Sequence, residues 1–169
     1  MQKQLKIAGV QVLITAVSFI AAVVLTYTAS SIVQTLFTLS ALLSAGANIS
    51  ADLWLRTIGQ DLYGHTFSGF IPLAGLVCIG FLLALPTAAV IAKYTGWPRY
   101  GLYPLAGAAA MATLHYGASH MIYDLNLMVG TRGVLGLSCF VLSGALGGAV
   151  FIHCLLRLSR SVKTNVVSP

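Results

Sequence analysis

The chain has 169 residues, of which 58% are hydrophobic and only 7% are charged, and its net charge is +6. A soluble domain carries roughly 25% charged residues, so this composition excludes a water-soluble globular fold and predicts an integral membrane protein. The acidic residues are three aspartates, and the positive charge has to be located along the sequence before it can indicate a partner.

The first apolar run, residues 7–27, follows Lys3 and Lys6 and is long enough to cross a bilayer as a helix. A basic start before an apolar run is also typical of a secretory signal peptide. This run is long for a signal peptide, however, and only a weak cleavage pair, Ala29 and Ser31, follows it. We therefore expect an uncleaved first span.

Residues 30–65 are predicted to form an outer amphipathic helical segment between the first and second spans. Turn-forming residues are missing at 28–31, so residues 30–45 are expected either to extend the first helix or to form a separate interfacial helix. Gly46 and Asn48 end this part of the segment.

The second part of this segment begins at Ser50, a predicted helix N-cap, with Asp52 in the first turn, where the helix dipole favours a carboxylate. Asp52, Arg56 and Gln60 then form a polar stripe, and Asp52 and Arg56 are predicted to pair at the surface. The predicted apolar face consists of Ala51, Leu55, Ile58 and Leu62, with Trp54 beside it. Such a helix is expected to lie on the membrane surface or over the mouth of a bundle.

Three further apolar runs predict the second, third and fourth spans, which are residues 69–92, 102–123 and 134–156. Pro86 lies inside the second span and is expected to kink its helix. The connection at 93–101 carries aromatic residues beside basic ones, a combination typical of the lipid headgroup level. A basic tail, residues 157–169, follows the fourth span.

The distribution of basic residues predicts the orientation of these four spans. With the N-terminus inside, the inner segments carry Lys3, Lys6, Lys93, Arg99, Arg157, Arg160 and Lys163, whereas the outer segments carry two basic residues and all three aspartates. We therefore expect an all-α, single-domain, four-helix membrane bundle with both termini cytoplasmic, in a bacterial inner (plasma) membrane. The basic residues then set the orientation of the chain in the lipid bilayer, which is its predicted partner, and no nucleic-acid partner is predicted.

Small residues at helical spacing predict packing faces on the third and fourth spans. The fourth span contains a GxxxG pair with a second small-residue pair beside it, and the third contains a ladder of small residues four positions apart. These residues are Ala109, Thr113, Gly117, Ser143, Gly144, Gly147 and Gly148. Packing within the chain is the favoured interpretation, and a homo-oligomer seam or docking onto a larger membrane complex is the alternative.

The third span also carries the polar groups most suited to chemistry. His115 and Tyr116 are predicted near mid-membrane, with His115 about 12 Å from the outer end of its helix. An ionisable group at that depth suggests a functional role. The favoured interpretation of His115 is nevertheless structural, as a neutral imidazole hydrogen-bonded within the bundle. His65, His120 and Asp124 are candidate ligands for a divalent metal such as zinc, against the favoured alternative of a polar girdle satisfied by water and headgroups.

The three cysteines form no CxxC pair, and the sequence contains no protease or phosphate-binding motif. No catalytic residue and no cofactor is therefore predicted. The leading hypothesis is a non-enzymatic structural, accessory or assembly protein that associates through its small-residue helix faces. The alternative is a small transporter or channel-like protein with a polar path at His115, Tyr116 and His120, and a metal-binding or redox membrane protein is the third hypothesis.

Overall fold

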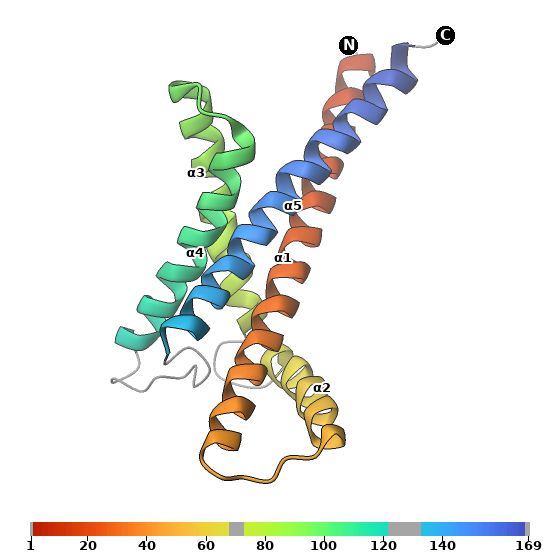
Figure 1. The fold of residues 1–169 in the computed structure, drawn as a ribbon. Coiled ribbons are helices and arrows are strands. Elements are labelled where there is room, and N and C mark those ends of the chain that lie inside the picture. Colours follow the sequence, from red (N-terminus) through yellow and green to blue (C-terminus); the bar gives the residue numbers. More distant parts are fainter. Residues whose placement is uncertain (1, 68–72, 122–132, 168–169) are drawn as a thin grey trace.

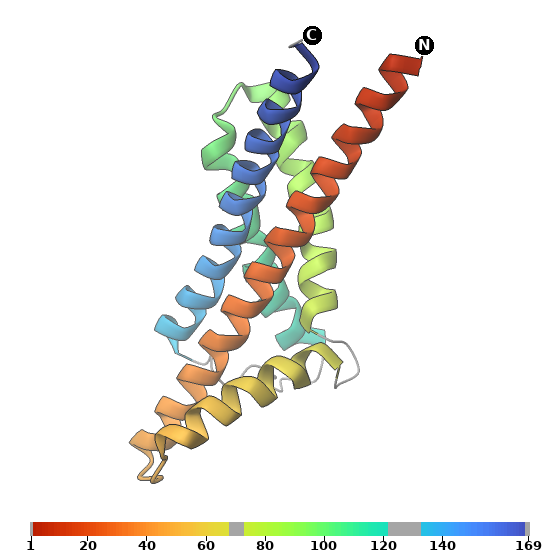
Figure 2. The same cartoon turned by 90° about the vertical axis from the view of Figure 1, so that its right-hand side faces the viewer.

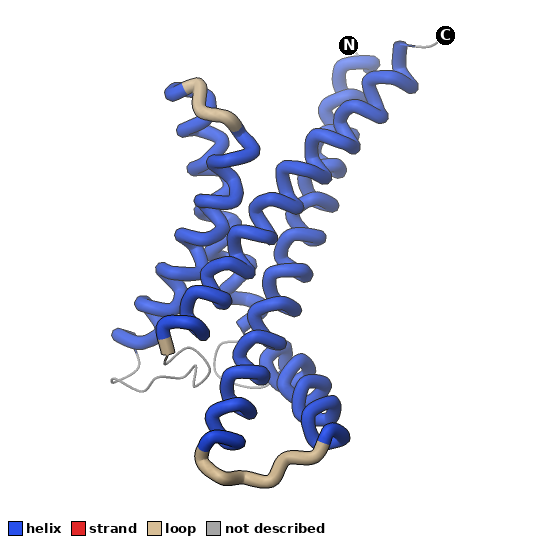
Figure 3. The backbone as a smooth tube through the Cα atoms, viewed as in Figure 1, coloured by secondary structure: helices blue, strands red, loops and turns tan. Residues whose placement is uncertain are grey.

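The computed structural model describes residues 2–67, 73–121 and 133–167, and it describes side chains for 9–64, 73–117 and 133–162. The described residues form helices, with described connections between α1 and α2 and between α3 and α4, as Figure 3 shows. The helices are α1 (Gln2–Ser44), α2 (Ala51–Phe67), α3 (Leu73–Thr95), α4 (Arg99–Met121) and α5 (Val134–Val167). The all-α prediction is confirmed.

Three of these helices are long and apolar enough to span a membrane. They contain the stretches Gly9–Ser44, Leu73–Thr95 and Val134–Val162, which lie in α1, α3 and α5. Helix α4 has 23 residues, the same length as α3, but its alanines, glycines, tyrosines and histidines make it less apolar. Helix α4 packs against both α3 and α5, and α5 also packs along α1.

The four long helices alternate in direction, so that both termini and the α3–α4 connection lie at one end of the molecule (Figure 1). Helix α2 lies at the other end, where it packs obliquely against the lower half of α1 (Figure 2). Lys93, Arg99, Arg157 and Arg160 therefore belong to the end with the termini, whereas Asp52 and Asp61 belong to the α2 end.

Helix α1 continues without a break through residues 30–44, so the first of the two alternatives, an extension of the first span, is what the chain forms. Its 43 residues measure about 64 Å, roughly twice the thickness of a bilayer's hydrocarbon core. Helix α3, with 23 residues, measures about 34 Å and matches that thickness.

The lower end of α1 projects past the other long helices. Gly147 of α5 packs between Thr26 of α1 and Phe81 of α3, so these residues share one level. Phe81 lies about 12 Å from the start of α3, and Gln34 lies about 12 Å further down α1 than Thr26. Gln34 is therefore near the level where α3 begins, and the end of α1 lies about 15 Å beyond it. We call residues 35–67 the projecting hairpin (Figure 1).

The predicted start of α2 is confirmed. The backbone N–H of Leu53 donates to the Ser50 hydroxyl oxygen at 3.3 Å, as an N-cap requires. Arg56 and Asp52 form an ion pair at 2.9 Å, and both side chains are about 70% exposed, so this pair contributes little stability. Gly46 has a φ of 90°, a left-handed conformation that ends α1 at low cost.

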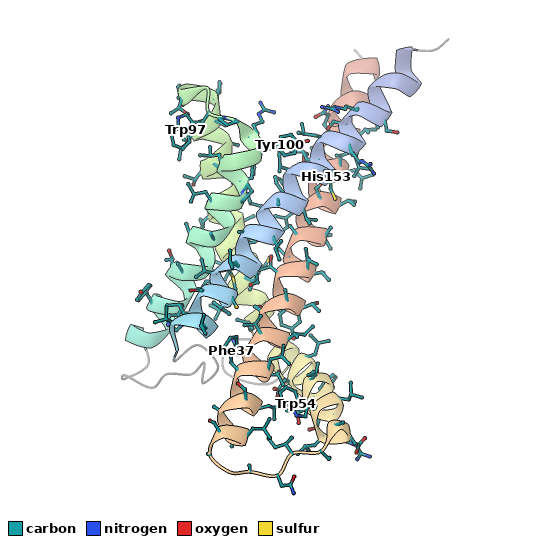
Figure 4. All side chains as sticks on the ribbon, in the orientation of Figure 1. Phe37, Trp54, Trp97, Tyr100 and His153 are labelled. Carbon is teal, nitrogen blue, oxygen red and sulfur yellow. The ribbon has the colours of Figure 1, made fainter. Side chains whose placement is uncertain are left out.

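The apolar face predicted for α2 is wrong at one end. Leu55 is 74% exposed, whereas Ile58 and Leu62 are partly buried, and Trp54 is also partly buried (Figure 4). Asp61 lies on the packed side, where it meets α1. The physical reason is that α2 packs against a polar stretch of α1 and not against lipid, so a carboxylate finds a hydroxyl partner there.

The core lies where α3, α4 and α5 meet α1. Its largest fully buried side chains are Phe81, Leu85, Met111, Phe140 and Ile152. Pro86 lies within the continuous helix α3, one residue after the buried Leu85, and is itself exposed. The connection after α3 turns at Gly96, whose φ is 69°, and the side chains of Tyr94, Trp97 and Tyr100 are exposed around it (Figure 4).

Candidate functional site

The GxxxG pair of α5 packs against α4 of the same chain. A Cβ atom added at Gly144 would overlap the carbonyl oxygen of Gly107, and one added at Gly148 would overlap the carbonyl oxygen of Tyr103. Gly107 is equally close to the backbone of Gly144. The α4 and α5 backbones therefore touch, which only glycine permits at these positions. This face of α5 is used inside the described chain.

The second small-residue pair of α5 faces a different pair of helices. At Gly147 an added Cβ would overlap the Thr26 hydroxyl and lie 2.9 Å from the Phe81 ring. The hydroxyl of Thr26 donates to the backbone carbonyl of Ser143 at 3.4 Å, and Ser143 is itself buried. Gly147 is thus the point where α1, α3 and α5 meet.

The partner face on α1 was missed by the sequence analysis. Ser18, Ala22, Thr26 and Ser30 are all completely buried and stand four residues apart. This is the same small-residue spacing that marks α5. This spacing is present in the sequence, but it does not stand out there because large apolar residues surround it.

The small-residue ladder predicted on α4 faces the surface instead of α5. Ala109 and Thr113 are exposed and line an apolar groove between α4 and α3. An added Cβ at Gly117 would meet no atom within 4 Å. The residues of α4 that do contact α5 lie on the neighbouring stripe of Tyr103, Gly107 and Met111.

A polar junction joins α2 to α1 and was not predicted as a site. The Thr35 hydroxyl donates to a carboxylate oxygen of Asp61 at 2.8 Å, and the Tyr27 hydroxyl donates to the backbone carbonyl of Leu62. Thr35 also lies 3.1 Å from the Ser31 carbonyl oxygen. These contacts join one side of α2 to two positions on α1 that are about two turns apart, so we call Tyr27, Thr35, Asp61 and Leu62 the α1–α2 junction.

Gln34 lies beside this junction with its side chain 7% exposed. Within the part of the chain that the structure describes, its amide nitrogen Nε2 is buried and has no hydrogen-bond partner. Leaving a buried amide donor unsatisfied costs about 1–3 kcal/mol, so this nitrogen is a position where water or another acceptor would bind.

His115 and Tyr116 lie in the second half of α4, between its middle and its end at Met121. His115 is about 9 Å from Met121 and about 24 Å from Arg99 along the helix, so it lies closer to the α2 end of the molecule, and its mid-membrane depth stays a prediction. The half-buried His115 ring is 6.4 Å from the Phe140 ring and 5.6 Å from that of Tyr116. Tyr116 is exposed and points away from the core.

The predicted metal ligands His65, His120 and Asp124 fall outside the side chains that the structure describes. Among the described side chains, no three His, Cys, Asp or Glu residues lie close enough together to hold a metal ion. His153 is exposed on α5 toward the end with the termini, away from His115 (Figure 4). The cysteines Cys78, Cys139 and Cys154 are half-buried free thiols.

The projecting hairpin exposes apolar side chains near its tip. Leu42 and Leu43 lie in the last turn of α1, and Leu53 and Leu55 lie in the first turns of α2. All four are exposed, with Leu55 the most exposed at 74%. We call these four residues the tip leucines.

No family model, curated protein or solved structure matches this chain.

Proposed function

We propose that this chain is a non-enzymatic accessory or assembly protein of a larger membrane complex, and that its projecting hairpin contacts another protein of that complex. The observation that carries the proposal is the exposure of the tip leucines on a segment that extends past the other helices. The α5 glycine faces, on which association was first predicted, are used in packing against α1, α3 and α4.

The position of the tip favours a protein partner over lipid. The hydrocarbon core is about 30 Å thick, and each headgroup layer adds about 5–8 Å. Helix α3 matches the core in length, and the end of α1 lies about 15 Å beyond the start of α3. The tip leucines would then stand past the headgroups, in water. Several exposed leucines at one end of a protein, in water, are a feature of protein interaction surfaces.

The α1–α2 junction supports the same function by fixing the hairpin. The hydrogen bonds of Tyr27 and Thr35 join α2 to two points on α1 about two turns apart, so the tip is presented on a pre-organised support. Pre-organisation lowers the entropy lost when a partner binds. We therefore assign Tyr27 and Thr35 of α1 to holding the hairpin.

The proposed setting is a bacterial inner (plasma) membrane crossed four times, by α1, α3, α4 and α5, with both termini cytoplasmic. The basic residues of the described helices, Arg56 excepted, belong to the end with the termini, which the positive-inside rule assigns to the cytoplasm. Helix α4 packs against α3 and α5, and the proposal places it among the membrane-crossing helices on that ground. The projecting hairpin would then face the outer side.

The experiment that tests this function is photo-crosslinking in native membranes. A photoreactive residue at position 55 is compared with one at position 83, because Leu83 of α3 is 68% exposed but lies in the proposed bilayer. We expect a discrete protein adduct from position 55 and lipid adducts alone from position 83. The adduct at position 55 should disappear with Leu42→Ser.

Two outcomes would overturn the proposal. Lipid adducts alone at position 55 would show that the tip lies in the membrane interface. An adduct with the mass of two copies of this chain would show that the surface forms a homo-oligomer and not a contact with another protein.

A further inference from the structure

A groove runs along the outward face of the α3–α4 pair. It has a volume of about 480 Å³ and an almost wholly apolar lining, and that volume is within the range of ligand-binding sites. Small residues form its floor and large exposed leucines form its walls; these are Gly80, Ala84, Ala106, Ala109, Leu83 and Leu105. From Gly80 to Ile91 the groove extends about 16 Å along α3.

One end of the groove opens next to two cations. Ile91 and Leu102 line that end. Lys93 stands two residues after Ile91, Arg99 stands three residues before Leu102, and both side chains are exposed. The Lys93 ammonium lies 5.9 Å from the centre of the Tyr94 ring. Exposed Trp97 stands in the same connection (Figure 4), and such aromatic residues lie at the headgroup level of a bilayer.

Among the residues that the structure describes, these cations have no acidic side chain at their end of the molecule. The sequence contains no acidic residue between Asp61 and Asp124, and Asp52 and Asp61 belong to the opposite end of the molecule. No described acidic side chain therefore balances Lys93 and Arg99, which leaves room for an external anion as their counter-charge. A phosphate at the headgroup level has the right sign and the right depth.

We propose that this groove binds an anionic glycerophospholipid, with one acyl chain along the small-residue floor and the phosphate between Lys93 and Arg99. The acyl chain restores the dispersion contacts that alanine and glycine leave unmade on a surface facing lipid. The two cations select an anionic headgroup over a zwitterionic one. This site is at the end opposite the projecting hairpin and does not depend on the function proposed for it.

The site can be tested with the purified full chain in detergent by native mass spectrometry. Dioleoylphosphatidylglycerol and dioleoylphosphatidylcholine, which share the same acyl chains, are added in turn. We expect the protein to retain phosphatidylglycerol in preference to phosphatidylcholine. In Lys93→Gln/Arg99→Gln the ratio of the two retained lipids should fall about fivefold for each cation removed. The charge-matched control, Arg157→Gln/Arg160→Gln, should keep the preference.

The groove itself is tested with a second pair of variants. Ala109→Phe fills the floor and should reduce retention of both lipids. Ala89→Phe, an exposed alanine of α3 outside the groove, should not. Because both positions are exposed, the fold should tolerate either change, which the unfolding temperature in detergent checks.

Four results would overturn the site. These are equal retention of the two lipids, loss of the preference in the Arg157/Arg160 control, displacement of the lipid by millimolar inorganic phosphate alone, and unchanged retention in Ala109→Phe. The last two would show that the acyl groove contributes nothing to binding. A photoreactive residue at position 109 that captures protein instead of phospholipid would assign the groove to a partner helix.

Discussion

Glycine residues in this protein allow helix backbones to touch, because they have no side chain at the points of contact. Gly107, Gly144 and Gly148 bring α4 and α5 together, and Gly147 admits Thr26 and Phe81. Hydrophobic burial does not drive helix association in lipid, so close approach and van der Waals contact have to supply it. Single atoms at these positions therefore decide how the helices fit.

The first residue-scale prediction concerns Gly107. Gly107→Ala places a Cβ against the Gly144 carbonyl oxygen, so the two helices have to separate, and we expect a loss of about 1–3 kcal/mol in stability. Unfolding of the purified protein in detergent measures it. The matched control is Gly117→Ala in the same helix, where the added methyl group meets open space and should be neutral or stabilising. Equal effects of the two changes would contradict a backbone contact at Gly107.

The second residue-scale prediction concerns the α1–α2 junction. Thr35→Val keeps the shape of the side chain but removes the hydroxyl that donates to Asp61, and a hydrogen bond to a charged group is worth about 1.5–3 kcal/mol. We expect faster amide hydrogen exchange throughout α2, because the helix loses one of its attachments to α1. Thr15→Val is the control, since the Thr15 hydroxyl donates to its own helix. Unchanged exchange in α2 would show that the junction does not hold it.

At the scale of elements, α2 is stable through a mixture of local and long-range contacts. Its N-cap at Ser50 and its Asp52–Arg56 pair are local, and both were predicted from the sequence. Its orientation depends on Tyr27 and Asp61, which belong to different helices. Local propensity therefore forms the helix, and the junction with α1 decides which of its faces is exposed.

Helix α1 shows the same division at greater length. Its continuity through residues 30–44 follows from the lack of any glycine or proline between residues 9 and 46. Its buried stripe of Ser18, Ala22, Thr26 and Ser30 is defined by what packs against it. Sequence periodicity predicts that the face with the large apolar residues is buried. In α1 the buried face instead carries small and polar residues, because a closely packed neighbouring helix requires small side chains there.

At the scale of the whole molecule, the two ends differ in charge and in shape. Basic and aromatic residues surround the α3–α4 connection, and the acidic residues of the described helices lie with the projecting hairpin. A protein with this asymmetry inserts in one orientation.

The prediction at this scale is the sidedness of three positions. In a variant without Cys78, Cys139 and Cys154, single cysteines are placed as Asn48→Cys, Trp97→Cys and Ser161→Cys. A membrane-impermeant maleimide added to intact cells should label position 48. It should label positions 97 and 161 only after the membrane is permeabilised, because the proposed orientation puts the basic end in the cytoplasm. Labelling of position 97 or 161 in intact cells would contradict four crossings with both termini inside.

The sequence by itself determined the features that follow from composition and from neighbours along the chain. These are the helical class, the long apolar helices, the cap at Ser50 and the end of α1 at Gly46. Only the tertiary structure decided the features that pair distant residues. Gly144 and Gly148 could equally have faced another chain, and their contact with Gly107 and Tyr103 assigns them to packing within this one.

The sequence predicts that residues 102–123 carry the groups most suited to chemistry, whereas the tertiary structure shows several residues of this span in other positions. Tyr103 and Gly107 hold α4 against α5, and Ala109 and Thr113 line the outer groove. Helical periodicity places residues on a face, but it cannot say which neighbour that face meets. Apolar and small residues can pack against lipid or against another helix. The choice between those surroundings is made by the partners, which lie far away in the sequence.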